Sequence, residues 1–175
     1  RCTTRRASAL HGTGGPLGVA DLRHHNVLSE ALIDAAGRAG FARNGDFNGE
    51  QQAGFGLYQV TQRNGARCSS ATAFLKPARR RDNLHVRTHA LVERVLVEQG
   101  RAVGVRLRRG RHDAERIEAG EVILAAGAIN SPQLLMLSGI GPADHLRGHG
   151  IAVVADVPDI GANLQDHLDI CTLDG

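Results

Sequence analysis

The chain has 175 residues and a formal net charge of +3, and 42% of its residues are hydrophobic. This composition provides enough apolar material for a globular core but too little charge for a nucleic-acid platform, and 3% aromatic residues leave little surface for base stacking. Its three cysteines are far apart and form no Cys-x-x-Cys pair, which excludes a disulfide framework or zinc knuckle and favours a reducing cytosol. No apolar run reaches bilayer-spanning length.

Two helices are expected in the first 81 residues. Residues 26–39 carry apolar side chains at helical spacing, and the repeat ends at Gly37 or Gly40. A shorter helix is expected over residues 69–75, where a serine is in position to cap it and Pro77 ends it. The longer one is typical of a surface helix that packs on a sheet.

Turn chemistry separates these two helices. The side chains of Asp46 and Asn48 either hydrogen-bond their own turn, which we expect, or form a pocket wall. Residues 55–60 predict a strand that runs into a tight turn at Asn64-Gly65.

Apolar runs predict a β-meander in the next part of the chain. Its strands are expected at residues 84–86, 90–97 and 102–107, with Gln99-Gly100 as a tight reversal between the last two. A further short apolar strand is expected at residues 121–125.

The strand predicted at 121–125 leads directly into a turn of small residues and then an apolar helix. Residues 126–128 (Ala-Gly-Ala) carry no large side chain, so a ligand is able to contact the main chain there. Ser131 is in position to cap the helix and Pro132 suits its first turn, which leaves backbone N–H groups free to bind an anion. From the residues alone this is either an anion or dinucleotide site or an ordinary strand-to-helix crossover.

Residues 127–141, Gly-Ala-x-x-Ser-Pro-x-Leu-Leu-x-x-Ser-Gly-Ile-Gly, resemble the second signature of the glucose–methanol–choline (GMC) oxidoreductases, which are FAD-dependent alcohol-oxidising enzymes. Three further stretches are similar to the same family, in the same order: Gly-Asp-Phe-Asn-Gly (45–49) with Gly-Phe-Gly-Leu-Tyr-Gln (54–59), Asn-Leu-x-Val-x-Thr (83–88) and Gly-Ala-Asn-Leu-Gln-Asp-His (161–167). The resemblance covers nearly the whole chain and is strongest to bacterial choline-dehydrogenase-like and primary-alcohol-dehydrogenase-like members.

This resemblance implies a mixed α/β (α+β) fold that combines a partial Rossmann-like FAD-binding domain with part of the GMC substrate domain. Residues 1–81 are expected to lie mostly in the substrate domain, residues 82–150 in the FAD-binding domain, and residues 151–175 to return toward the substrate domain. Family members begin with a strand and a Gly-x-Gly-x-x-Gly turn and end with a catalytic histidine segment, and neither feature occurs here. We therefore expect an internal portion of a larger enzyme that is inactive by itself.

The resemblance also implies the residues that contact FAD. The backbone of Val92 is expected to bond the adenine ring, Ala126 and Gly127 to contact the cofactor, and Asn130 and Ser131 to lie next to that site. A primary alcohol, choline-like or aliphatic, is expected to lose its hydroxyl proton to a histidine outside this chain and a hydride to the flavin. A quinone, another carrier or oxygen would then take the electrons.

The nine histidines predict no metal site. His145 and His149 are four residues apart, but Gly148 between them predicts a poor helical clamp. Asp166 and His167 imitate an orienting dyad. Because the resemblance places the base elsewhere, we expect a structural role for His167 at a domain junction.

Two other classes of protein remain open at this point. A non-catalytic α/β binding module would keep the same framework, and a flavoprotein of another family would share the Ala-Ala-Gly strand end but not the segment that follows it. We expect a cytoplasmic protein, in solution or peripheral to the inner membrane, that binds no nucleic acid.

Overall fold

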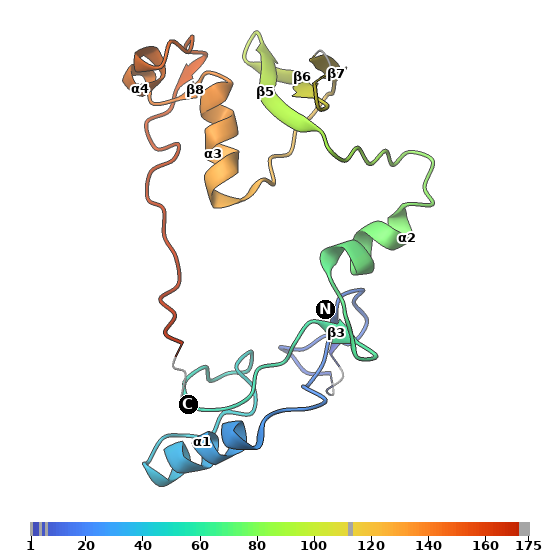
Figure 1. The fold of residues 1–175 in the computed structure, drawn as a ribbon, viewed down its shortest axis with the longest axis vertical. Helices are drawn as coiled ribbons and strands as arrows, with labels where there is room; N and C mark the ends of the chain where they lie inside the picture. The colour runs from blue at the N-terminus through green and yellow to red at the C-terminus, as the bar shows by residue number, and fades with distance from the viewer. Residues whose placement is uncertain (1, 4, 6, 112–113, 172–175) are drawn as a thin grey trace. The chain divides into compact units, whose positions relative to one another are not determined.

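The computed structural model describes residues 2–3, 5, 7–111 and 114–171. The chain divides into two compact units, residues 1–86 and 87–175. Both helices and strands are present, as Figure 1 shows, so the prediction of a mixed α/β fold is confirmed. The assignment of residues 1–81, 82–150 and 151–175 to substrate and FAD-binding domains stays a prediction.

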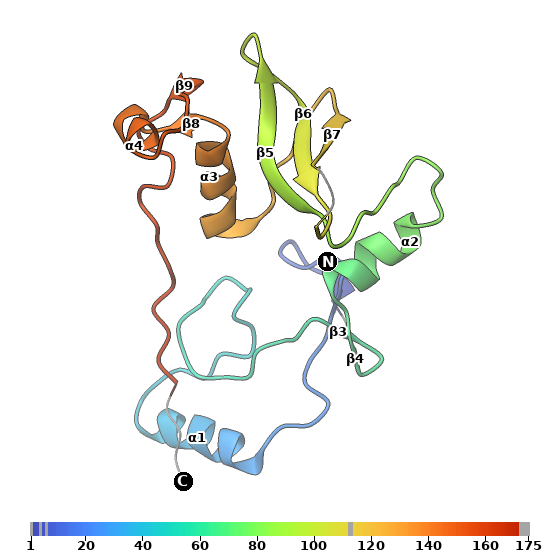
Figure 2. The ribbon, with the colours of Figure 1, turned by 45° about the horizontal axis from the view of Figure 1, so that its top comes forward.

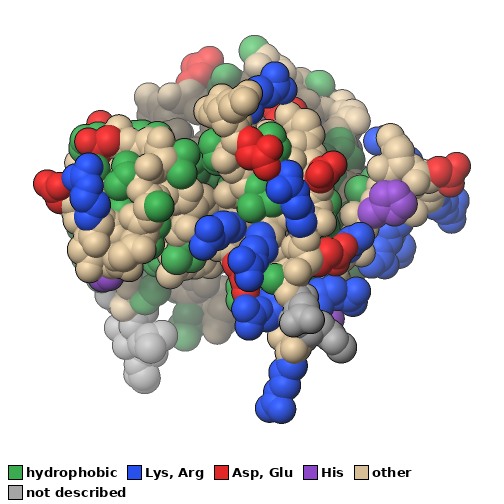
Figure 3. All heavy atoms as spheres, turned by 90° about the horizontal axis from the view of Figure 1, so that it is seen from above, with side chains coloured by type: hydrophobic (Ala, Val, Ile, Leu, Met, Phe, Trp, Pro, Cys, Tyr) green, Lys and Arg blue, Asp and Glu red, His purple; other side chains and the backbone are tan. Residues whose placement is uncertain are grey.

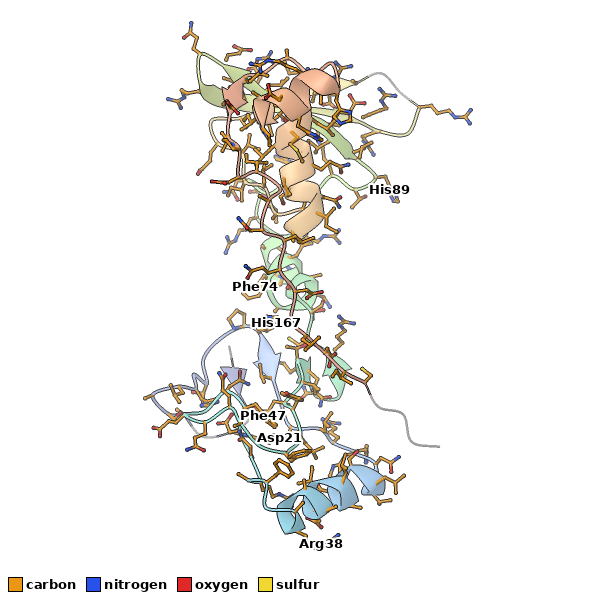
Figure 4. The ribbon with its side chains drawn as sticks, turned by 90° about the vertical axis from the view of Figure 1, so that its left-hand side faces the viewer. Asp21, Arg38, Phe47, Phe74, His89 and His167 are labelled. Atoms are coloured by element: carbon orange, nitrogen blue, oxygen red, sulfur yellow. The ribbon has the colours of Figure 1, made fainter. Side chains whose placement is uncertain are left out.

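The longest helix of the N-terminal unit is α1 (Val27–Arg38), whose last residue is labelled in Figure 4. Asn26 caps it, because its Oδ1 accepts the backbone N–H of Leu28 at 2.9 Å. Ile33 and Ala36 are its buried residues. This element confirms the helix predicted from residues 26–39.

The strands of this unit are short. β1 (Cys2–Thr3) pairs in parallel with β2 (Gly18–Val19), and β3 (Gln62–Arg63) pairs antiparallel with β4 (Ala66–Arg67). Asn64 and Gly65 both have positive φ, 53° and 80°, as a two-residue hairpin of this hand requires. The predicted turn is therefore confirmed. The strand predicted at 55–60 is wrong, because this segment forms only isolated bridges from Val60 to Ala20 and from Phe55 to Arg43.

A π-helix, η1 (Ala71–Leu75), continues into the short helix α2 (Lys76–Ala78). Ser69 supports its start, since its Oγ accepts the backbone N–H of Thr72 at 3.3 Å. Pro77 does not end the helix as predicted. It is the second residue of α2 and lies inside the continuous helical run from Ala71 to Ala78.

The C-terminal unit contains a three-stranded antiparallel sheet in the order β5-β6-β7, shown in Figure 2. Its strands are β5 (Leu91–Glu98), β6 (Arg101–Arg108) and β7 (Glu115–Glu118). Gln99 and Gly100 make the predicted reversal, with φ of 50° and 78°. The prediction of a strand at residues 84–86 is wrong, because these residues form no regular secondary structure. β7 takes its place as the third strand, although its Glu-Arg-Ile-Glu sequence gives almost no apolar signal.

The helix after the small-residue turn is α3 (Gly127–Leu137), which lies beside β5 in Figure 1 and Figure 2. It begins five residues earlier than a cap at Ser131 predicts, and Pro132 therefore lies inside it. Beyond it, β8 (Ile140–Gly141) pairs in parallel with β9 (Ala155–Asp156), and α4 (Ala143–Gly148) lies between them in sequence.

The buried core of this unit is small. Val95 in β5, Leu107 in β6, and Ala143 and Leu146 in α4 are its most enclosed apolar side chains. Residues 121–125, predicted as a strand, pair with no other strand within the described ranges. Because a strand is stabilised by hydrogen bonds to a neighbour, an apolar sequence alone does not create one.

Candidate functional site

An open groove with a volume of about 830 Å³ lies in the C-terminal unit. Its walls come from β5, from the unpaired segment before α3 and from α3 itself. The lining residues are 90–94, 105–106, 122–126, 130, 133–134 and 137. Most of them are apolar, and the cavity is of the size typical of a cofactor or small-ligand site.

The structure brings three of the five predicted cofactor residues to this groove: Val92, Ala126 and Asn130 line it. Gly127 and Ser131 do not line it but adjoin Ala126 and Asn130 in sequence. Gly127 has φ of +88°, a conformation that L side chains rarely adopt, and a Cβ there would meet no atom within 4 Å. The main chain at the start of α3 is thus accessible.

Ser131 holds this main chain in place by a hydrogen bond that differs from the predicted cap. Its Oγ accepts the backbone N–H of Ala126 at 3.0 Å, so the side chain reaches back past the first turn of α3. Such a bond satisfies the donor that precedes the helix and leaves the N–H groups of the first turn free for another acceptor.

The opposite wall is the outer strand β5, whose free edge faces α3. The N–H of Val95 donates to the Oγ of Ser138 at 2.8 Å and therefore points away from β6. Glu93 is an extra residue in the ladder, because Val92 pairs with Leu107 and Arg94 with Arg106. Along a strand, the main-chain N–H and C=O groups of successive residues point alternately toward and away from the neighbouring strand. Because the bulge adds one residue to this alternation, the main-chain groups of Val92 point to the same free edge as those of Val95.

Sequence reasoning missed the role of Ser138. This residue is 8% exposed, its Oγ donates to the carbonyl oxygen of Leu134 at 2.6 Å, and it also accepts the N–H of Val95. The partner in β5 lies 43 residues away in sequence. The family-like Ser-Gly-Ile-Gly motif marks the position but gives no sign of its partner.

The acidic side chain of Glu93, which lines the groove, is paired with two arginines. The carboxylate of Glu93, only 22% exposed, contacts Arg106 Nε at 3.1 Å and an Arg108 guanidinium nitrogen at 2.7 Å. Figure 3 shows basic and acidic side chains close together on one face of the molecule. The bulge residue is thereby clamped to β6.

The N-terminal unit contains a smaller cavity of about 230 Å³, lined in part by Arg5, Asp21 and Tyr58. The Arg5 guanidinium donates to the carboxylate of Asp21 at 2.6 Å and to the carbonyl oxygen of Gly45 at 2.6 Å. Hydrogen bonding to Asp21 raises the pKa of Arg5, and hydrogen bonding from Arg5 lowers the pKa of Asp21, against the opposing effect of desolvation. Because the charges of Arg5 and Asp21 neutralise each other, this pair does not favour the binding of a charged ligand in the cavity.

The side chain of Asp46 serves its own turn. Its Oδ1 accepts the N–H of Asn48 at 3.1 Å, and the N–H of Gly49 donates to the carbonyl oxygen of Asp46 at 3.0 Å. The Nε2 of His11 lies 3.2 Å from Oδ2 of Asp46, without hydrogen-bond geometry. The expectation that Asp46 bonds its own turn is confirmed, while the side chain of Asn48 is exposed.

The histidines form no cluster with other ligands, because no group of three or more His, Cys, Asp or Glu side chains converges within the part of the chain that the structure describes. Gly148 was expected to weaken the helix between His145 and His149, but it lies inside α4. The rings of His145 and His149 lie 4.6 Å apart. The carboxylate of Asp166 accepts the backbone N–H of His167 at 2.8 Å, and among the described residues no hydrogen bond joins it to the imidazole.

No helix among the described residues is long and apolar enough to cross a bilayer.

Comparison with known proteins identifies the family. The model of the GMC oxidoreductase family matches residues 3–169. The chain is 51% identical over 165 residues to an alcohol dehydrogenase [acceptor] of Pseudomonas putida, covering 93% of this chain and 30% of the relative. It is 48% identical over 159 residues to an oxygen-dependent choline dehydrogenase of Brucella ovis, covering 91% of this chain and 29% of the relative.

Solved structures agree with these sequence matches. Pyridoxine 4-oxidase from Mesorbium loti matches with a TM-score of 0.79 and 34% identity, over 85% of this chain and 30% of that one. An FAD-dependent oxidoreductase from Chaetomium thermophilum matches with a TM-score of 0.79 and 27% identity, over 87% of this chain and 27% of that one.

The chain therefore belongs to the GMC oxidoreductase family. It spans about 30% of the length of the curated relatives that it matches. The match over residues 3–169 confirms the resemblance drawn from the motifs and removes the alternative of a flavoprotein from another family.

Proposed function

We propose that this chain forms one flank of the FAD site, with part of the substrate domain, in an oxidoreductase that oxidises a primary alcohol to the aldehyde. The observation that carries this proposal is the open groove between the free edge of β5 and the accessible main chain of residues 126–128. Hydride acceptance is the chemistry that FAD supplies when bound.

The residues present fit an FAD nucleotide. Val92 offers main-chain hydrogen-bonding groups on one wall, which suit the edge of an adenine ring. The opposite wall presents the small residue Ala126, and next to it Gly127 begins the first turn of α3, whose free N–H groups suit phosphate oxygens. Asn130 adds a polar side chain at the rim, and Ser131 keeps Ala126 in position.

The names of the relatives support the proposed substrate class. The Pseudomonas putida relative is named for alcohol and the Brucella ovis relative for choline, which is itself a primary alcohol. One of them is named for an unspecified acceptor and the other for oxygen, so the electron acceptor is left as a quinone, another carrier or oxygen. This chain's part is to bind and orient the cofactor, and we assign the proton-accepting histidine to the remainder of the enzyme. We place the enzyme in the cytoplasm, in solution or at the inner membrane surface.

The proposal is tested with the full-length protein that carries this sequence. It is expected to purify yellow, with a flavin absorption spectrum that bleaches when choline or an aliphatic primary alcohol is added without oxygen. A colourless protein that takes up no FAD would overturn the proposal. A protein that holds FAD without reduction by any primary alcohol would favour the non-catalytic binding module instead.

A further inference from the structure

A single hydroxyl joins two walls of the groove at the C-terminal end of α3. The Oγ of Ser138 accepts the N–H of Val95 in β5 at 2.8 Å and donates to the carbonyl oxygen of Leu134 in α3 at 2.6 Å. Because Ser138 is only 8% exposed, water does not readily replace either bond.

This tie acts on the strand edge that carries Val92. An outer strand presents unpaired main-chain groups, and its position is held only on one side by the sheet. Between Val92 and Val95 lies the bulge at Glu93, where the ladder is locally interrupted. A fixed point just beyond the bulge, at Val95, therefore limits how far the edge at Val92 moves relative to α3.

We propose that Ser138 is a positioning residue for the adenine half of FAD, a role that rests on the function proposed above. Its hydroxyl is consumed by Val95 and Leu134 and does not contact the cofactor. It sets the spacing between the main chain of Val92 on one wall and that of Ala126 on the other. The adenine and the phosphates then meet a groove whose walls are already in place.

Substitutions at Ser138 separate the effect of its hydrogen bonds on nucleotide binding from the effect of its size. In Ser138→Ala the buried N–H of Val95 has no acceptor, so the unliganded strand edge relaxes and the nucleotide has to restore it on binding. Ser138→Thr keeps the hydroxyl, and Ser138→Cys keeps the bulk with a weaker donor and acceptor. The more hydrogen bonding a variant loses, the larger its dissociation constant for the nucleotide is expected to be. The Thr variant is therefore expected to be closest to wild type, followed by Cys and then Ala.

Asp156→Ala is the matched control. Its Oδ1 accepts the backbone N–H of Ala143 at 3.0 Å and so ties β9 to α4, away from the groove. This variant loses a bond of similar length in the same unit. A purely structural effect on nucleotide binding would appear in it as well.

The experiment measures the binding of ADP and of FAD to the apo form of the full-length protein by calorimetry, with the thermal midpoint of each variant recorded in parallel. Ser138→Ala is expected to raise both dissociation constants about tenfold, whereas Asp156→Ala lowers the thermal midpoint without changing them. Ser138→Cys serves the same comparison if the Ala variant does not fold.

Unchanged constants in the Ala and Cys variants would overturn the positioning role, and so would an equal rise in Asp156→Ala. Wild-type protein that binds neither ADP nor FAD would overturn the proposed function itself, and the role of Ser138 with it. Normal binding by the wild type alongside unchanged variants would overturn the role of Ser138 alone.

Discussion

The hydroxyl of Ser131 accepts the backbone N–H of Ala126 at 3.0 Å, so one predicted cofactor residue holds the main chain of another. The bond bridges the left-handed Gly127, which turns the chain from the extended segment into α3. Ser131 therefore supports the site through the backbone rather than by capping the helix that was expected to follow it.

Ser131→Ala is expected to lower the free energy of unfolding by about 1 kcal/mol, the usual effect of losing a side-chain bond at a helix start. Urea unfolding of the full-length protein measures this loss. Ser131→Thr keeps the hydroxyl and is expected to behave like the wild type. An unfolding curve of Ser131→Ala that coincides with the wild-type curve would rule out the bond's contribution.

Gly104 is the point in β6 where a side chain is not tolerated. Its φ is +156°, and an added Cβ would collide with the carbonyl oxygen of Ile117 in β7. Gly104→Ala is expected to destabilise the protein by more than about 2 kcal/mol, because either the strand or its neighbour has to shift.

Gly148 provides the matched control for this substitution. It lies in α4 with no positive φ and no atom within 4 Å of an added Cβ, so Gly148→Ala is expected to stabilise the helix by about 0.5–1 kcal/mol. Thermal unfolding of both variants gives the comparison. Equal effects of the two alanines would contradict the packing of β6 against β7.

The ion pair of Arg5 and Asp21 predicts a loss of stability in acid. Hydrogen bonding from Arg5 lowers the pKa of Asp21 below its ordinary value of 3.8, so the unfolded chain binds the proton more readily than the folded chain. The stabilisation is present above pH 3.8 and is lost as the pH falls through the lowered pKa. The raised pKa of Arg5 means that its guanidinium stays charged throughout this acid range, so Asp21 alone causes the pH dependence of the pair.

Asp21→Asn is expected to remove this pH dependence. The carboxylate side chain is 56% exposed, so solvent screens the pair and the expected loss is about 1 kcal/mol or less. Thermal midpoints recorded from neutral pH down into acid measure it, with Asp34→Asn as a control in the exposed pair to Arg43. If the thermal midpoints of wild type and Asp21→Asn fall equally as the pH is lowered, other groups cause the loss of stability in acid.

Local signals in the sequence were sufficient for the elements that depend on near neighbours. The helix at residues 26–39, the turn at Asn64-Gly65 and the reversal at Gln99-Gly100 are set within a few residues, and the structure contains each. The candidate cofactor segment at residues 126–128 was also recognised from short-range features, namely small residues directly before an apolar helix.

Signals that depend on distant partners were not available in the sequence. Ser138 has its partner 43 residues away, and β7 is held by pairing with β6 although its residues are mostly charged. Residues 121–125 have the apolar composition of a buried strand but no neighbour within the described part of the chain. Pro132 was placed in a first turn, and Gly127 in fact starts the helix four residues before the predicted cap.

The 175-residue chain alone is expected to oxidise no primary alcohol. We propose that it forms one flank of the FAD site; its sequence contains no Gly-x-Gly-x-x-Gly turn of the kind that the resemblance leads us to expect at the FAD pyrophosphate, and we assign the proton-accepting histidine to the remainder of the enzyme. Loss of groups that act in the transition state typically lowers a rate by several orders of magnitude. Dye reduction by the purified chain, supplied with FAD and choline or an aliphatic primary alcohol, measures the residual rate against the full-length protein. Sustained turnover by the short chain would place a complete catalytic apparatus within these residues, and His167 would then be the first to replace by alanine.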